Sequence, residues 1–201
     1  MHYKQLRDLV VTAGDWADDR DRDLFVVLAD FRNRPFDAVF PQLSIGADAA
    51  PVWLTIAILM ALRPGTRRRA ASRGTSTLAV SSVVTNLLLK RITRRPRPPL
   101  EKLHPLHEFP EQPRTTSFPS GHAASAAGFV AGAASEYPLL ALPLGVLAGA
   151  ICYSRVYTGA HYPGDVLAGA TVGVFFAKTS DLSWITDRVF TAAGQVLRRS
   201  R

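Results

Sequence analysis

Three short segments of the chain carry the side chains that could do chemistry. They are Lys90–Pro98, Pro119–His122 and Ser154–Asp165. Together they hold two histidines, one carboxylate, several basic side chains and a Ser-Gly pair that precedes an apolar stretch. Basic groups neutralise an anion, and a histidine can attack it, so this set is suited to chemistry on a phosphate group.

The first two segments each offer an anion site. Lys90 and Arg97 are seven residues apart, so on a continuing helix they would face the same way. Arginine has a planar fork that matches phosphate oxygens, and lysine adds a point charge. Ser120 and Gly121 precede His122 and an apolar helix, whose first amide groups favour an anion. Taken alone, the first segment is more often a basic collar against lipid headgroups, and Ser120 is as often a simple helix cap.

The third segment offers an activated histidine. His161 and Asp165 flank Pro163-Gly164, which is typical of a turn into a helix. A carboxylate near an imidazole fixes its tautomer and raises its basicity. Arg155 could reach the same point from the end of the preceding helix. Charged groups at the ends of apolar spans are costly unless they are functional, so we disfavour a merely interfacial histidine with a capping aspartate.

The three segments together match phosphoryl transfer. One histidine would attack, and the other would protonate the departing oxygen. No further carboxylate pair or Cys/His set offers a metal site, although three glutamates lie in the long loop: Glu101, Glu108 and Glu111. The sequence therefore disfavours a magnesium-dependent route and predicts a site with no metal and no other cofactor.

The apolar residues of the chain are gathered into blocks, whereas a soluble domain disperses them periodically. The 201 residues carry a net charge of +8, which favours an anionic partner, and the mean hydropathy of +0.07 averages very different segments. Five blocks are candidate spans: Ile45–Leu62, Gly74–Leu89, Ala123–Ser135, Leu139–Ser154 and Val166–Lys178. Several are short against the roughly 20 residues usually needed. Their many small residues predict close helix packing, in an all-α integral-membrane bundle of about five or six transmembrane helices.

The two ends of the chain are more polar than its middle. Residues 1–44 are predicted to form an amphipathic helix, broken near Arg34-Pro35, that lies on the membrane interface or packs against the rest. Residues 45–180 form the membrane domain that carries the site, and residues 181–201 form a basic amphipathic tail. Acidic residues near the start argue against a secretory signal peptide.

The order of the spans predicts where the three segments lie. Two crossings return a chain to its starting side, so all three segments should face one side of the membrane. The arginine-rich Arg63–Arg73, expected as a turn, then falls on the opposite side. By the positive-inside rule that turn is cytoplasmic, which places the site outside the cytoplasm. The basic residues of the 90–118 loop oppose this count, but they have the competing chemical explanation given above.

The three segments resemble the signature of the type 2 phosphatidic acid phosphatase family, whose superfamily also contains vanadium haloperoxidases and bacterial class A acid phosphatases. That signature is a lysine, six residues and Arg-Pro; then Pro-Ser-Gly-His; then Ser-Arg, five residues, His, three residues and Asp. The chain meets it without departure at Lys90, Arg97-Pro98, Pro119-Ser120-Gly121-His122, Ser154-Arg155, His161 and Asp165. At about one chance match in twenty for each position, coincidence is negligible. The resemblance covers Gly74–Lys178 and is strongest to actinobacterial membrane members.

The resemblance implies a role for each matched residue. His161 would be the nucleophile, Asp165 its partner and His122 the general acid. Five residues would hold the phosphate: Lys90, Arg97, Ser120, Gly121 and Arg155. The implied activity is metal-independent hydrolysis of a lipid phosphate monoester or diphosphate through a phosphohistidine. Its partners would be the lipid substrate and membrane lipids, with no nucleic acid. The residues do not choose among phosphatidic acid, phosphatidylglycerophosphate, a polyprenyl diphosphate and a polyprenyl sugar phosphate, nor do they indicate an oligomeric state.

Two other functions fit part of the pattern. A vanadate-dependent haloperoxidase would use the same anion site, but those enzymes are soluble and longer. A basic membrane protein that only binds anionic lipid or nucleic acid would explain the charge. It would not explain His161, Asp165 and His122 at the signature spacing, and it should tolerate the loss of either histidine.

Overall fold

The protein is helical wherever the structure shows regular elements, which confirms the predicted all-α class. The structure is a computed structural model that describes residues 15, 17–28, 34–46, 50–99 and 115–199. Residues 17–28 form a helix, here called the N-terminal helix. The later elements are α2 (Arg34–Gly46), α3 (Ala50–Ala61), α4 (Thr66–Val83), the π-helical turn η1 (Val84–Leu89), α5 (Lys90–Ile92), α6 (Gly121–Glu136), the 3-10 turn η4 (Pro138–Leu140), α7 (Ala141–Tyr157), α8 (Pro163–Thr179) and α9 (Ser183–Arg199).

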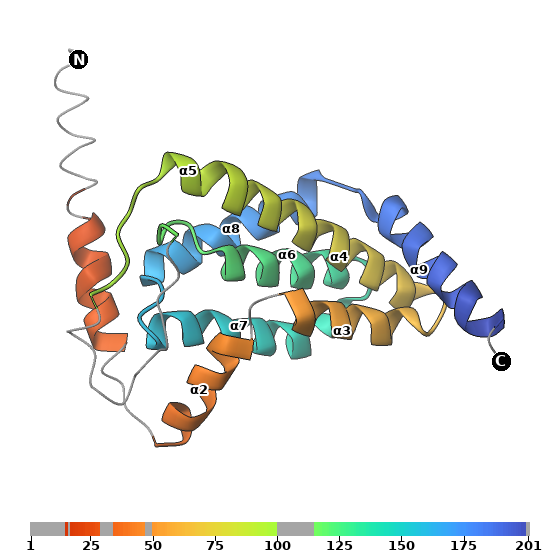
Figure 1. Cartoon of the computed structure of the whole chain (residues 1–201), viewed down its shortest axis with the longest axis horizontal. Coiled ribbons are helices and arrows are strands. Elements are labelled where there is room, and N and C mark those ends of the chain that lie inside the picture. The colour runs from red at the N-terminus through yellow and green to blue at the C-terminus, as the bar shows by residue number, and fades with distance from the viewer. Residues whose placement is uncertain (1–14, 16, 29–33, 47–49, 100–114, 200–201) are drawn as a thin grey trace, which may run out of the picture.

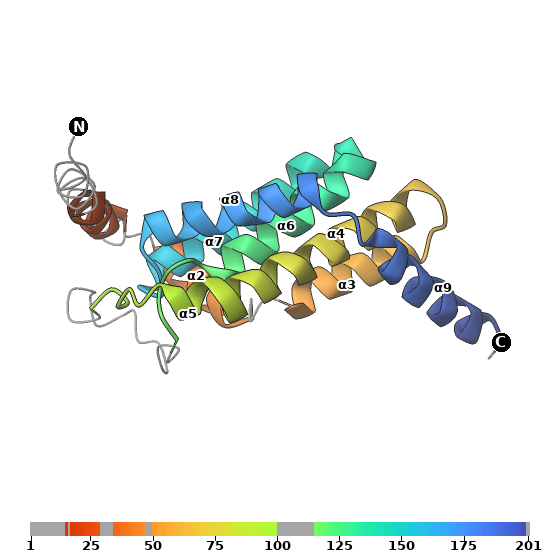
Figure 2. The ribbon, with the colours of Figure 1, turned by 90° about the horizontal axis from the view of Figure 1, so that it is seen from above.

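The helices α3, α4, α6, α7 and α8 run side by side as an elongated bundle (Figure 1). Helix α6 lies at its centre and packs most extensively against α4 and α8. Helices α4, η1 and α5 follow one another without a break, so Lys90 lies near the end of a long helical rod. Figure 2 shows the N-terminal helix at one end of the bundle and α9 at the other.

Small residues let the central helices approach closely, as the sequence predicts. A Cβ atom added to Gly173 of α8 would lie only 2.4 Å from the carbonyl oxygen of Ala124 on α6. On the other side of α6, a Cβ at Gly128 would lie 3.2 Å from the carbonyl oxygen of Thr77. The Thr77 hydroxyl also donates to the Gly128 carbonyl at 2.9 Å. Backbone-to-backbone packing of this kind is how helices associate without large apolar side chains.

The arginine-rich stretch is not the turn that the sequence predicted. The turn is confined to residues 62–65, and α4 begins at Thr66. Gly65 has a φ of 92°, a left-handed conformation that suits glycine and allows the reversal. Arginine and alanine favour helix strongly, so the residues up to Arg73 extend α4 by two turns.

This arginine-rich start of α4 supports the last helix. Arg68 pairs with Asp187 at 3.0 Å, and Arg73 pairs with Asp181 at 2.6 Å, on and just before α9. The Thr186 hydroxyl donates to the carbonyl of Ser72 at 2.7 Å. The predicted basic tail is therefore a helix, α9, which docks at the bundle end opposite the N-terminal helix (Figure 2).

One helix within the described residues, Pro138–Tyr157, is long and apolar enough by itself to cross a membrane. Pro51–Ala61 is a shorter apolar helix. Length and hydropathy thus identify fewer spans than the five expected. Alanine and glycine make up much of α6 and α8, and arginines begin α4, which lowers the hydropathy of these helices.

Candidate active site

The three sequence segments meet at one end of the bundle, opposite the arginine-rich start of α4 (Figure 1). They enclose a cavity of about 210 Å³. Its lining contains six of the eight predicted site residues: Lys90, Arg97, Gly121, His122, Arg155 and His161. The other two, Ser120 and Asp165, are buried and do not line the cavity. Four polar residues that the sequence did not single out complete the lining: Ser82, Asn86, Thr115 and Ser125.

His161 is positioned by the end of α7. Gly159, two residues earlier, has a φ of 65°, a left-handed conformation that ends the helix and turns the chain back. The backbone amides of Ala160 and His161 both donate to the carbonyl of Arg155 at 3.0 Å. The position of the histidine is therefore set by the same helical turn that carries Arg155. Its side chain is 1% exposed.

Asp165 lies behind His161 and is fully buried. Its Oδ2 faces Nδ1 of His161 at 3.6 Å, slightly longer than a hydrogen bond. The same oxygen accepts hydrogen bonds from the Ser117 hydroxyl at 2.6 Å and from the backbone amide of Tyr162 at 2.9 Å. These bonds aim the carboxylate at Nδ1. A carboxylate at this nitrogen favours the tautomer with the proton on Nδ1, which leaves the Nε2 lone pair for attack.

Arg95 holds the other oxygen of Asp165. Its guanidinium donates to Oδ1 at 2.6 Å and also pairs with Asp18 and with Asp21, the latter at 2.8 Å. It lies over the Tyr162 ring, 4.2 Å from the centroid. The sequence placed Arg95 in a basic run but gave no reason to single it out. It joins the site to the N-terminal helix, which carries Asp18 and Asp21.

The same helix makes two further contacts with the start of α8. Asp21 accepts from the backbone amide of Gly164 at 2.7 Å. Phe25 packs edge-on against Tyr162 with ring centroids 5.5 Å apart. Part of the predicted amphipathic segment of residues 1–44 therefore packs against the domain, the second of the two arrangements considered for it.

The surroundings of His161 keep its imidazole neutral. Burial, together with the charges of Arg97 and Arg155, lowers the pKa of His161 from 6.5 to about 4, against the opposing effect of Asp165. The histidine is thus unprotonated at neutral pH. A neutral imidazole is the form that can act as a nucleophile.

Lys90 reaches the cavity from the helix α5, whereas Arg97 reaches it from the extended segment that follows this helix. The helix ends at Ile92, because Pro96 and Pro98 disfavour helix, so the two residues do not share a helical face as the spacing suggested. The Arg97 guanidinium donates to the Thr115 carbonyl at 2.9 Å and to its hydroxyl at 3.0 Å. Burial, with the nearby arginine charges, lowers the pKa of Lys90 to about 8.

Arg155 is buried on the side of the cavity next to α2. Its Nη1 donates to the carbonyl of Ser44 at 2.9 Å and to the Ser44 hydroxyl at 2.6 Å. Ser44 lies near the end of α2, and nothing in its sequence context marks it. The contact crosses 111 residues of sequence, so it forms only once the bundle has assembled.

The start of α6 is built for close packing. Ser120 caps the helix, with its hydroxyl 3.4 Å from the amide of Ala123, and its own amide donates to the carbonyl of Asp165 at 2.9 Å. The Ser120 side chain is buried in this role and does not line the cavity. A Cβ at Gly121 would lie 2.7 Å from Oδ1 of Asn86, so a larger residue there would displace the Asn86 side chain from the cavity wall. His122 lines the cavity with His161, which brings the two histidines together.

Within the part of the chain that the structure describes, no group of three or more His, Cys, Asp or Glu side chains is placed to hold a metal ion. The loop glutamates Glu101, Glu108 and Glu111 lie outside the described residues. The positive groups that line the cavity are Lys90, Arg97 and Arg155.

An all-helical bundle that places a neutral buried histidine, a carboxylate behind it, a second histidine and three cations around one small cavity is chemically suited to phosphoryl transfer. The model of the PAP2 superfamily matches residues 74–186, more than half of the chain. The chain belongs to the PAP2 superfamily, as its motifs predict.

Two curated relatives are phosphatases by name. The chain is 36% identical over 125 residues to the decaprenylphosphoryl-5-phosphoribose phosphatase of Mycobacterium tuberculosis, covering 60% of this chain and 65% of that protein. It is 33% identical over 127 residues to the lipid A 1-phosphatase of Rhizobium johnstonii, covering 61% and 48%. The chain thus spans a half to two thirds of the length of these relatives.

Two solved structures share the fold. One is a transmembrane PAP2 type phosphatidylglycerolphosphate phosphatase from Bacillus subtilis, with a TM-score of 0.62 and 21% identity, covering 87% of this chain and 92% of that one. The other is Aquifex aeolicus LpxE, with a TM-score of 0.60 and 25% identity, covering 78% and 92%. The chain therefore has the fold of a membrane protein.

Proposed function

We propose that this protein is a membrane phosphatase that hydrolyses a phosphate monoester or diphosphate on a lipid, with a phosphohistidine on His161. The observation that carries the proposal is the pairing of a neutral, buried His161 with His122 across one cavity that three cations line. Membership of the PAP2 superfamily supports it.

The proposed reaction gives each of these residues a step. Lys90, Arg97 and Arg155 neutralise the phosphate in the cavity. Nε2 of His161 attacks phosphorus, and Asp165 stabilises the positive charge that forms on the imidazole. His122 gives its proton to the departing oxygen as the bond from phosphorus to that oxygen breaks.

The second half of the reaction restores the enzyme. His122, now neutral, takes a proton from water, and the resulting hydroxide attacks the phosphohistidine. The bond between phosphorus and Nε2 breaks, inorganic phosphate leaves, and His161 is neutral again. The proton that His122 gives to the leaving oxygen in the first half is replaced by the proton it takes from water in the second. No oxidation or reduction takes place.

The names of the relatives guide the choice of substrate. They include phosphatases of a decaprenyl-linked phosphoribose, of lipid A and of undecaprenyl diphosphate. Each of these named substrates is an amphiphile with a phosphate at its polar end. We therefore infer that the substrate of this chain keeps an apolar chain in the membrane while its phosphate enters the cavity.

A phosphate-release screen tests the proposed function. Purified protein in detergent is offered phosphatidic acid, phosphatidylglycerophosphate, a polyprenyl diphosphate and a polyprenyl sugar phosphate, beside glycerol phosphate. We expect at least one lipid to have a far higher kcat/KM than glycerol phosphate, because remote binding energy supports the chemistry. Equal efficiency on glycerol phosphate would indicate a general acid phosphatase. No release from any lipid by folded protein would reject the proposal.

We also propose that the chain crosses the membrane several times with its site on the extracytoplasmic face. The site and the arginine-rich start of α4 occupy opposite ends of the bundle, and arginine clusters favour the cytoplasm. Cysteines replacing the exposed Arg91 and Arg67, in a chain whose Cys152 is replaced, test this. An impermeant thiol reagent should label position 91 in intact cells and spare position 67. The reverse pattern would place the site in the cytoplasm.

A further inference from the structure

A lipid phosphate must place an apolar chain as well as its phosphate, and the active-site cavity is small and polar. A second, larger hollow of about 390 Å³ lies between α2, α3 and α7. Its apolar lining includes Val39 and Leu43 of α2, Val52 of α3, and Leu147 and Ile151 of α7. We call it the apolar groove. Its volume lies within the range of about 300–1,000 Å³ that is usual for small-molecule sites.

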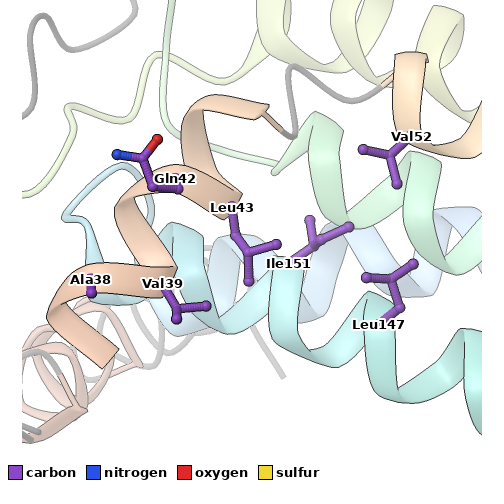
Figure 3. A pocket seen from close by; sticks show the side chains of 7 residues that line it. All are labelled: Ala38, Val39, Gln42, Leu43, Val52, Leu147 and Ile151. Atoms are coloured by element: carbon purple, nitrogen blue, oxygen red, sulfur yellow. The ribbon is translucent and has the colours of Figure 1, made fainter. Parts of the chain in front are cut away.

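The groove presents almost nothing that could bind a polar group. Figure 3 shows Leu43 and Ile151 next to each other, with Leu147 and Val52 further along. Gln42 is the polar side chain in the lining, and its amide points away from Leu43 and Ile151 (Figure 3). A sugar or a headgroup would lose its hydrogen bonds to water here without replacement, whereas a hydrocarbon chain would lose none.

The groove lies next to the active-site cavity. Ile151 lines the groove, and Arg155, one helical turn later on α7, lines the phosphate cavity. On α2, Leu43 lines the groove, and the next residue, Ser44, binds the Arg155 guanidinium through two hydrogen bonds of 2.9 and 2.6 Å. The groove and the active-site cavity are thus separated by one layer of side chains, which consists of Arg155 of α7 and Ser44 of α2.

We propose that the apolar groove binds the part of the substrate's acyl or prenyl chain that follows the phosphate. This inference rests on the proposed function and assigns the chain of that substrate to α2, α3 and α7. The phosphate reaches the face of Arg155 that lines the cavity, and the chain runs along the face that borders Ile151. Residues of α2 then decide which chains the enzyme accepts.

Filling the groove tests the proposal. Val39→Trp and Leu147→Trp both place a large ring in the groove. Val39 is 50% exposed and lies outside the core cluster, whereas Leu147 is half-buried and packs against it, so Val39→Trp is the variant that leaves the core untouched. Val146→Trp is the matched control, because Val146 is the neighbour of Leu147 on α7, is 65% exposed and does not line the groove. Each variant is assayed with dioctanoyl phosphatidic acid and with nitrophenyl phosphate, which has no chain.

The ratio of the two kcat/KM values should fall at least ten-fold in both groove variants and stay at the wild-type value in Val146→Trp. Burial of one methylene group changes an affinity about four-fold, so losing two such contacts suffices. An unchanged ratio in both groove variants, or an equal fall in the control, would overturn the proposal. If wild-type protein released no phosphate from the lipid, the proposed function itself would fail instead.

A second measurement needs no substitution. Wild-type protein is irradiated with an alkyl phosphate that carries a diazirine on the first carbons of its chain, and the labelled peptides are identified. Labels should fall on α2 and α7 and should decrease with excess unmodified lipid. Labels confined to α8 or α9, or a groove covered by a second copy of the chain in a crosslinked dimer, would overturn the proposal.

Discussion

Nη1 of Arg95 lies 2.6 Å from Oδ1 of Asp165, so the carboxylate next to His161 is held by a side chain seventy residues earlier in the chain. The same guanidinium pairs with Asp18 and Asp21 of the N-terminal helix. Asp165 and a helix that lies outside the signature of the family thus share one cation.

Removing this cation should slow the reaction. In Arg95→Ala the buried Asp165 loses its charged partner, and its orientation toward His161 then depends on Ser117 and Tyr162 alone. Groups that orient a functional ligand are typically worth about 10–100-fold, so we expect kcat to fall by about that factor with a smaller change in KM. Arg94→Ala is the control, because Arg94 is exposed. Equal losses in the two variants would mean that total charge, and not the contact with Asp165, is responsible.

The two histidines should respond differently to the leaving group. His161→Ala should abolish activity on every substrate, because nothing then accepts the phosphoryl group. His122→Ala should cost about 10²–10⁴-fold with a lipid alkoxide, which needs a proton to leave. It should cost far less in phosphoenzyme formation from nitrophenyl phosphate, whose nitrophenolate leaves unaided. The phosphoenzyme can be trapped with substrate that carries labelled phosphate. If His161→Ala still binds label covalently and His122→Ala does not, the two roles would have to be exchanged.

The alkaline limb of the pH profile should belong to Lys90. Its pKa is lowered to about 8, so the side chain is charged below that pH and neutral above it. A charged Lys90 attracts the phosphate, so kcat/KM for nitrophenyl phosphate should fall by up to about ten-fold per pH unit above 8. The substrate is a dianion throughout this range, since its second pKa is about 6.

Lys90→Arg is the matching variant, because arginine stays charged at these pH values. Its limb near pH 8 should disappear even if its activity is lower overall. A limb that persists in this variant would assign the titration to another group.

Ser44→Ala should weaken substrate binding from outside the signature. The hydroxyl accepts a hydrogen bond of 2.6 Å from Arg155, and hydrogen bonds to charged groups contribute about 1.5–3 kcal/mol. If half of that is lost from phosphate binding, KM should rise about four- to twelve-fold while kcat changes little. Thr179→Ala, at the exposed end of α8, is the control. A fall in kcat without a change in KM would contradict a role through Arg155.

Activity should persist in excess chelator and fall with vanadate, which adopts the trigonal bipyramidal geometry of a phosphoryl group in transfer. Lys90, Arg97 and Arg155 already bring the positive charge that a metal would supply. Loss of activity in chelator that magnesium restores would reject this mechanism.

The site could be predicted further than the spans could. Phosphate chemistry restricts which residues may stand at fixed spacings, so the motifs alone brought Lys90, Arg97, His122, Arg155 and His161 to one cavity. Arg95, Ser44 and Asn86 escaped prediction because their roles come from packing between distant segments, which leaves no periodicity in the sequence. The motif predicts that Ser120 holds the phosphate; in the structure its hydroxyl caps α6 and its side chain is buried, and the predicted role stays a prediction.

The helices were predicted well where apolar residues dominate and poorly where helix propensity decides. The hairpin of α6 and α7 and the helix α8 fall where the apolar blocks predicted them. The charge of the arginines after Gly65 suggests a turn, but arginine is a good helix former and the segment is helical. Charge reports where a residue meets water, and it says little about the backbone conformation.

The loops that carry the catalytic residues are tied to one another through their main chains. Ser117 donates to the carbonyl of Arg95, Ser120 to that of Asp165, and His161 to that of Arg155, all within 3.0 Å. These amides should exchange with deuterium as slowly as those of the helices, although they belong to loops. In the proposed reaction these groups are then already in position before the lipid arrives, so little conformational entropy is lost when it binds.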